Sequence, residues 1–321
     1  MSIHLYLLVH VQSGGHRGQE IFDQLKSACK AQNISYTYRI SDYEGHTIAL
    51  VKEMALEIKQ STKEQRLVVI GGDGTLNEAI TGLLTSKQDL PIAYFPAGSG
   101  NDFARELKLT KSIDRFLQLI QIAPTKEVEL LTYESHSQQM SGYALNSIGF
   151  GFDAYICQLK KNSSQKSLLS RLGLGKLTYL SKLAKAFKSH SAFSAHLLDD
   201  SGQSYHFQQI LFIDILNHSY FGGGIRIDPL SKSNDHQVAF LAAHHVKARD
   251  IFRIAPKILF TGSHYKEVNH ISRQAAKSFS ITLDQPAYMQ TDGEVYPPKA
   301  YDLSISLITY PIWDTSDTMS S

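Results

Sequence analysis

The chain has 321 residues, of which 42% are hydrophobic and 19% are charged, and its formal net charge is +2. This length favours two domains, and these proportions are ordinary for a globular protein. A nucleic-acid-binding protein is usually far more basic, so we expect no nucleic acid as a partner. Two cysteines, Cys29 and Cys157, give neither a metal-binding spacing nor a disulfide framework, which favours a reducing cytoplasm.

The first residues are apolar but lack a basic lead and a small-residue cleavage site, so they predict a strand rather than a signal peptide. No apolar run approaches the roughly 18 residues that a membrane span needs. We therefore expect a cytoplasmic protein whose contact with a membrane is peripheral.

Strand and helix patterns alternate over residues 1–125. Apolar runs predict strands at 3–11, 34–40, 66–70 and 91–98, and helical spacing predicts helices at 19–32, 47–60 and 75–84. Such alternation is typical of a parallel sheet with helices on both faces. We therefore expect a Rossmann-like three-layer α/β domain, whose ligand lies outside the carboxyl ends of the strands.

Strand patterns dominate residues 126–300, where we expect a mostly antiparallel β-sandwich. The strand-like runs are 127–133, 142–152, 193–198, 205–216, 237–246, 278–283 and 303–310. Asp-Ser-Gly at 200–202 predicts a hairpin turn, and helical stretches are expected near 154–188 and 247–262. Residues 301–321 are expected to supply a last strand and a tail that pack back onto the N-terminal domain.

A glycine-rich segment, GGDGT (71–75), follows the strand at 66–70 and leads directly into a helix. Glycines let the backbone approach a ligand closely, and a helix N-terminus presents N–H groups to an anion. The chain has neither a Walker A sequence nor GxGxxG after its first strand. The motif alone therefore predicts either a phosphate site or a plain strand-to-helix turn.

A second glycine segment, PAGSGNDFAR (96–105), follows the next strand. Its Asp102 and the Asp73 of GGDGT stand at adjacent strand ends. Magnesium takes few direct carboxylates and keeps several waters, and phosphoryl transfer needs mainly positioning and charge neutralisation. Together the two segments favour a site for phosphates and a magnesium ion.

GGDGTLNE with PAGSGNDFAR resembles the diacylglycerol kinase catalytic family, especially its soluble bacterial lipid kinases. VHVQSGGHRG (9–18) is similar to the first-strand loop of that family, ALNSIGFGFDA (144–154) and NHSYFGGGIRIDPLSKSND (217–235) to its middle motifs, and TDGEV (291–295) to its late Asp-Gly-Glu motif. The resemblance thus extends over most of the chain. It implies an α/β domain like those of NAD kinases and diacylglycerol kinases, followed by a β-sandwich.

The same resemblance implies ATP and Mg2+ as cofactors and transfer of the γ-phosphate to a lipid hydroxyl, with diacylglycerol giving phosphatidate in phospholipid biosynthesis. It places the reaction in a cleft between the domains, with Asp292 facing the γ-phosphate. Asp292 would accept the hydroxyl proton as catalytic base, supported by Glu294. Without the resemblance, Asp-Gly-Glu would indicate only a β-turn.

The resemblance also assigns nucleotide and metal ligands. The nucleotide-binding residues are Ser13, Gly14, Ser41, Gly71, Gly72, Asp73, Gly74, Thr75, Asn77, Glu78, Ser99, Asn101 and Asp102. A magnesium–water network would use Asp73, Asp102 and Glu129, where Glu129 replaces a family aspartate. A structural Mg2+ would be held by the Asp235 side chain and the carbonyls of Lys232 and Gln237.

Two segments depart from the family pattern. His10 and Val11 replace the usual Asn-Pro of the first loop, and His236 replaces the glycine after Asp235, although histidine enters the left-handed region less readily than glycine. A catalytically degenerate lipid- or nucleotide-binding protein is therefore one alternative. A nicotinamide-dinucleotide kinase is another, because GGDGT occurs there too, although the GSGNDFAR segment argues against it.

Residues 158–190 contain eight lysines and arginines, interleaved with leucines, and no acidic residue. Such a basic amphipathic stretch can lie on an anionic membrane surface, which suits a lipid substrate that stays in the bilayer. A solvated helix that packs its leucines on the sandwich is the alternative. A monomer and a homodimer are both left open.

Overall fold

The computed structural model describes residues 3–61, 64–135, 137–161, 187, 191–247, 249–250, 257 and 270–318. The chain forms two compact units. The first consists of residues 1–129, 222–224 and 309–321, and the second of residues 130–221 and 225–308. The domain boundaries predicted from the sequence were residues 125 and 300.

The first unit is built from alternating strands and helices. They are β1 (His4–Val9), α1 (Ser13–Ala31), β2 (Ser35–Ile40), α2 (His46–Gln60), β3 (Gln65–Gly71), α3 (Asp73–Thr85), β4 (Ile92–Pro96), α4 (Asp102–Glu106) and α5 (Ile113–Ile122). The strands pair in parallel in the order β2-β1-β3-β4. The end of β17 (Asp302–Trp313) lies parallel to β4, with Ile312 opposite Ile92.

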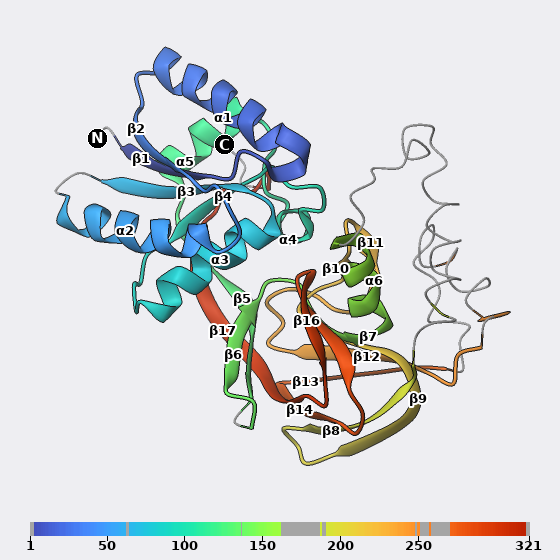
Figure 1. Ribbon diagram of the computed structural model, residues 1–321. Coiled ribbons are helices and arrows are strands. Elements are labelled where there is room, and N and C mark those ends of the chain that lie inside the picture. The colour runs from blue at the N-terminus through green and yellow to red at the C-terminus, as the bar shows by residue number, and fades with distance from the viewer. Residues whose placement is uncertain are drawn as a thin grey trace. The chain divides into compact units, whose positions relative to one another are not determined.

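Helices cover both faces of this sheet (Figure 1). The apolar stripes of α1 and α5 pack on β1, β3 and β4 through residues such as Phe22, Leu25 and Phe116. On the other face α2 and α3 pack against each other and the sheet. Central strands buried on both faces carry continuous apolar runs, as in LYLLV of β1. The predicted three-layer α/β domain is confirmed.

The second unit is mostly antiparallel β-structure. Its elements are β5 (Thr125–Ser135), β6 (Met140–Ala144), β7 (Ser147–Gly151), α6 (Phe152–Lys161), β8 (Phe193–Asp199), β9 (Ser204–Leu216), β10 (Tyr220–Phe221), β11 (Ile225–Arg226), β12 (Val238–His244), β13 (Ile271–Ala276), β14 (Ser278–Leu283), β15 (Ala287–Thr291) and β16 (Glu294–Lys299). Strands β5 and β17 contribute residues to both units.

The strand pairs of this unit are antiparallel, as predicted for residues 126–300. Their core is rich in aromatic side chains, including Phe150, Phe240 and Phe279. The predicted hairpin is confirmed between β8 and β9. There Gly202 has φ +85°, and Oδ1 of Asp199 accepts the N–H groups of Ser201 and Gln203, both at 2.9 Å.

Some elements differ from the prediction. The run 142–152 forms two strands instead of one. The first, β6, ends at Ala144 and the second, β7, begins at Ser147. Helix α5 and strands β13, β15 and β16 were not predicted. Strand β16 contains Pro297 and Pro298, which are tolerated because β16 ends the strand order.

The two helical stretches expected near 154–188 and 247–262 fall mostly outside the described residues. Helix α6 covers the start of the first and ends at Lys161. Among the described residues, no helix combines the length and the apolar character needed to cross a bilayer.

Candidate active site

Three glycine loops meet at the carboxyl ends of β1, β3 and β4. A Cβ added to Gly98 would lie 2.6 Å from Cα of Gly72, and one added to Gly14 would collide with the carbonyl oxygen of Ala97. The N–H groups of Ala97 and Gly98 donate to the carbonyl oxygen of Gly71, at 2.7 and 3.1 Å. The loops therefore pack backbone against backbone, and only glycine fits at these positions.

Helix α3 begins directly at the GGDGT loop. Its N-cap residue, Gly72, offers no side-chain acceptor to the first turn. Thr75 is buried and packs against Gly71, whereas Gly74 is exposed. A helix N-terminus without a side-chain cap suits an anion, since it presents N–H groups and the positive end of the helix dipole.

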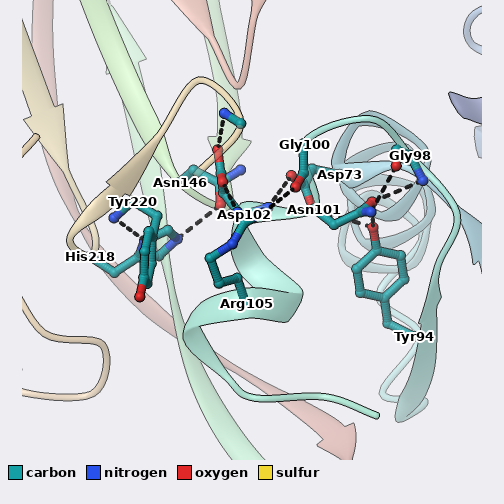
Figure 2. Close-up of polar contacts among 11 residues, drawn as sticks. Asp73, Tyr94, Gly98, Gly100, Asn101, Asp102, Arg105, Asn146, His218 and Tyr220 are labelled. Atoms are coloured by element: carbon teal, nitrogen blue, oxygen red, sulfur yellow. Dashed lines mark hydrogen bonds and ion pairs between the residues drawn. The ribbon is translucent and has the colours of Figure 1, made fainter. Parts of the chain in front are cut away.

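Asp73 and Asp102 are brought together by a direct hydrogen bond. Oδ2 of Asp73 accepts the backbone N–H of Asp102 at 2.9 Å, and Oδ1 accepts the hydroxyl of Tyr94 at 3.3 Å (Figure 2). Tyr94 is fully buried, and burial together with the nearby Asp73 carboxylate raises the pKa of its hydroxyl well above the usual value. Tyr94 therefore stays neutral, and its one proton is shared among Oδ1 of Asp73, the carbonyl oxygen of Gly71 at 3.2 Å and Oδ1 of Asn101 at 3.4 Å.

Asp102 is buried and has its own partners. Its carboxylate forms an ion pair with Arg105 and accepts the N–H of Gly223 at 2.7 Å (Figure 2). Arg105 also donates to the carbonyl oxygen of Gly100 at 3.1 Å. Arg105 thus partly neutralises the acidic pair and braces the loop. The i,i+3 spacing of Asp102 and Arg105 is compatible with an ion pair on a helix. No role for Arg105 was predicted from the sequence.

Asn101 holds the second glycine loop closed. It is buried in a left-handed conformation, with φ +54°. Its side chain accepts the N–H of Gly98 at 2.9 Å and donates to the carbonyl oxygen of Gly98 at 2.8 Å. Ser99, within the same loop, is exposed. Asn101 therefore stabilises the conformation of the loop, while Ser99 is exposed to solvent at its tip.

The first loop is joined to the end of β2. Nδ1 of His10 lies 2.9 Å from Oγ of Ser41 and 3.3 Å from its carbonyl oxygen. Ser41 and Ser13 are both buried, and Gly14 has φ +61°. His10 thus makes a polar contact with Ser41, a predicted nucleotide-binding residue.

Two more predicted residues lie on α3. Oε1 of Glu78 accepts the N–H of Gly45 at 2.9 Å, and Oδ1 of Asn77 accepts the hydroxyl of Thr81 at 3.1 Å. Glu78 therefore anchors the loop between β2 and α2 to the helix that follows GGDGT.

The predicted magnesium ligands belong to different units. Asp73, Asp102 and the buried Glu129 belong to the first unit, whereas Lys232, Asp235 and Gln237 share an exposed loop of the second. Among the described residues, no group of three or more His, Cys, Asp or Glu side chains is placed to hold a metal ion.

The candidate ligands in each unit can be compared with the oxygen ligands that Mg2+ takes. Asp73 and Asp102 supply carboxylate oxygens, a ligand type that Mg2+ takes directly or through its waters. In the exposed loop Oδ1 of Asp235 accepts the N–H of Gln237 at 3.1 Å. His236 there has φ +60°, so the histidine adopts the left-handed turn that glycine supplies in the family.

Asp292, the predicted base, lies in the turn between β15 and β16. Its carboxylate accepts the N–H groups of Leu145, Asn146 and Ser147, at 2.6, 2.8 and 3.2 Å. These donors occupy the break between β6 and β7. Glu294 begins β16 and is exposed. Asp292 thus ties two distant segments of the second unit together, a role that sequence analysis missed.

Asn146 also contacts a buried histidine of the NHSYFGGG motif. Nε2 of His218 lies 2.8 Å from Oδ1 of Asn146, and Nδ1 accepts the N–H of Tyr220 at 3.2 Å (Figure 2). Since Oδ1 can only accept, the proton of the neutral ring is placed on Nε2. The two middle motifs named from the sequence are therefore in direct contact.

Two protein families match this chain, one in each part of its length. Residues 4–133 match the model of the diacylglycerol kinase catalytic domain, and residues 146–306 match that of the YegS C-terminal NAD kinase beta sandwich-like domain. The second model spans half of the chain, so the chain belongs to the family of the YegS C-terminal NAD kinase beta sandwich-like domain, and its N-terminal part matches the diacylglycerol kinase catalytic domain. The predicted order of an α/β domain and a β-sandwich is thereby confirmed.

Relatives of this family match along nearly the whole chain. "Putative lipid kinase YtlR" of Bacillus subtilis (strain 168) is 24% identical over 307 residues, covering 94% of this chain and 97% of the relative. "Putative lipid kinase" of Staphylococcus aureus (strain Newman) is 25% identical over 292 residues, covering 89% and 87%. The family and the names of these relatives support a kinase.

Solved structures of family members share the fold. "A putative diacylglycerol kinase from Bacillus anthracis str. Sterne" aligns with a TM-score of 0.70 at 20% identity, covering 97% of this chain and 96% of that one. A second crystal structure of a diacylglycerol kinase from the same strain aligns with a TM-score of 0.66 at 19% identity, covering 97% and 96%.

Proposed function

We propose that this family member is an ATP- and Mg2+-dependent lipid kinase that transfers the γ-phosphate of ATP to a lipid hydroxyl, with diacylglycerol giving phosphatidate. The observation that carries the proposal is the close packing of Gly14, Gly72 and Gly98 at the carboxyl ends of three parallel strands. This packing brings the exposed Gly14 close to the loop that leads into α3, where Gly72 is partly exposed and Gly74 is exposed, so that backbone without a Cβ can approach a phosphate chain. It stands beside the uncapped start of α3, as an anion site requires.

The charge of the site suits a triphosphate only with a cation present. Asp73 and Asp102 bring negative charge to the loops, and Arg105 offsets part of it. When bound, Mg2+ would neutralise phosphate oxygens and polarise the transferred phosphoryl group. Asp73 and Asp102 would hold its water shell, with Tyr94 keeping Asp73 oriented through its hydroxyl.

Asp292 is proposed to accept the proton of the lipid hydroxyl. Three N–H donors fix its carboxylate, so its orientation is set before substrate binds. The adjacent Glu294 would assist from the start of β16.

A lipid substrate would require the enzyme to act at a membrane surface. The basic stretch at 158–190, most of which falls outside the described residues, is proposed to provide peripheral contact with anionic lipids. Diacylglycerol is the proposed acceptor because residues 4–133 match the diacylglycerol kinase catalytic domain.

The proposal is tested by incubating the purified protein with Mg2+, γ-labelled ATP and diacylglycerol in mixed micelles, with phosphatidylglycerol and NAD as parallel acceptors. We expect labelled phosphatidate and a loss of at least about a hundredfold in rate for Asp73→Asn. The exposed Glu20→Gln is the matched control and should keep full activity.

Each other outcome has a definite meaning. Label on NAD would contradict the lipid assignment, and label on phosphatidylglycerol would change the acceptor. ATP binding without label on any acceptor would indicate a degenerate binding protein. Full activity of Asp73→Asn would remove the proposed role of that carboxylate.

A further inference from the structure

An exposed aromatic pair stands in the loop between β2 and α2. The rings of Tyr43 and His46 are stacked, with centroids 4.5 Å apart and planes inclined by 5°. Tyr43 is 64% exposed, one of the largest exposures among the described large hydrophobic residues. A stacked tyrosine that gains so little from burial presents an aromatic face to solvent rather than to a core.

Hydrogen bonds hold this pair in a fixed orientation. Nδ1 of His46 accepts the N–H of Asp42 at 3.2 Å, and the Asp42 carboxylate lies 3.8 Å from the same nitrogen. Gly45, with φ +86°, makes the turn that brings His46 into the first turn of α2. The ring of Tyr43 therefore rests on a second ring that is itself anchored to the backbone.

The loop is also attached to the candidate phosphate site. The N–H of Gly45 donates to Glu78 of α3, and Ser41 at the start of the loop contacts His10 of the first loop. Glu78 lies five residues after Asp73, which corresponds to about 8 Å along a helix that rises 1.5 Å per residue. The aromatic pair is thus linked by short contacts to two of the three elements that form the phosphate loops.

We propose that the Tyr43–His46 stack is the platform on which the purine base of the nucleotide lies. This inference rests on the proposed function, because it takes the triphosphate to be bound at the glycine loops. A purine has a flat π-face, and stacking on an aromatic ring is a sequence-tolerant way to hold it. The base then adds affinity through Tyr43, while the glycine loops bind only the phosphates.

The test distinguishes binding of the purine base from binding of the phosphates. Calorimetric titration of the whole protein with Mg-ATP, and separately with inorganic tripolyphosphate, is compared for wild type, Tyr43→Ala and Tyr43→Phe. We expect Tyr43→Ala to weaken ATP binding about tenfold and to leave tripolyphosphate binding unchanged, and Tyr43→Phe to retain ATP affinity. Tyr38→Ala removes another exposed tyrosine, 46% exposed, from the same unit and should change neither affinity.

The outcomes distinguish this inference from the proposed function. Unchanged ATP affinity in Tyr43→Ala, or an equal loss for ATP and tripolyphosphate, would overturn the base platform and leave the kinase proposal standing. A wild-type protein that binds no ATP would overturn the kinase proposal and the platform with it. Thermal unfolding of each variant checks that the exposed loop substitution has left the fold intact.

Discussion

At the scale of single residues, the proposed base Asp292 also has a structural task that conflicts with the proposed one. A catalytic base needs a free lone pair, whereas three of the lone-pair sites of Asp292 already accept N–H groups from residues 145–147. The contacts are charge-assisted and therefore strong. The carboxylate consequently organises the break between β6 and β7 as well as serving the proposed chemistry.

Replacing Asp292 with asparagine should therefore affect stability as well as turnover. The amide nitrogen of Asn cannot accept, so at least one backbone N–H loses its partner, at a cost of about 1–3 kcal/mol. We expect a lower urea midpoint for Asp292→Asn and a loss of phosphatidate formation. Glu294→Gln, at an exposed side chain, should unfold as the wild type does.

Unfolding and activity can then be compared for the two roles. If Asp292→Asn unfolds at the wild-type midpoint, the scaffold role is wrong. Turnover that survives in a destabilised Asp292→Asn would instead rule out Asp292 as the base.

At the scale of elements, the first turn of α6 meets β9 through two buried carboxylates. All four carboxylate oxygens of Asp153 and Asp214 are buried, and the two carboxyl groups interact with each other. Burial raises the pKa of Asp153 to about 6, and burial together with the Asp153 charge raises the pKa of Asp214 well above its usual value. Gly149 on β7 leaves the space that both side chains fill.

This pair should make the folded state less stable as the pH rises. In the unfolded chain both groups ionise near pH 4, whereas in the folded chain they keep their protons to higher pH. The folded state therefore binds more protons, and its free energy of unfolding falls as the pH rises from about 4 through about 6 and beyond. The full contribution is present only below pH 4.

The pH dependence is measured as urea midpoints between pH 5 and 8 for wild type and Asp214→Asn, whose side chain is neutral throughout. We expect a shallower decline in the variant. Asp89→Asn, at an exposed position, should keep the wild-type slope. Parallel curves for wild type and Asp214→Asn would show that the buried pair does not control this dependence.

At the scale of the whole molecule, the first unit needs the end of the chain. Residues 309–321 belong to it, and the guanidinium of Arg66 on β3 lies 3.6 Å from the centroid of the Trp313 ring. The hydroxyl of Tyr310 donates to the carbonyl oxygen of Leu90 at 2.7 Å. The first unit is therefore completed only after the second unit has been synthesised.

Loss of the Trp313 ring should loosen the first unit selectively. Trp313→Ala removes the cation–π contact and apolar burial, together worth about 2 kcal/mol. We expect faster hydrogen exchange in β3 and β4, with β9 of the second unit unchanged. Trp313→Phe keeps a ring beneath Arg66 and should have a smaller effect, whereas uniform acceleration across both units would contradict the prediction.

Local patterns in the sequence predicted most of the strands and helices and the loops at which a ligand is expected. Alternating apolar runs predicted the parallel sheet, and GGDGT and PAGSGND marked the strand ends where a ligand is expected, because glycine and helix-starting residues act locally. The same local view failed at Pro297 and Pro298, which are unfavourable in a strand unless it lies at an edge.

Only the tertiary structure decided which of these residues meet. The packing of Gly14 on Ala97, the contact of His10 with Ser41 and the binding of Asp292 to residues 145–147 join segments far apart in the chain. Such contacts depend on how the strands are ordered and registered, which no local periodicity specifies. The sequence by itself therefore determined a family and its loops, and the fold determined which atoms those loops bring together.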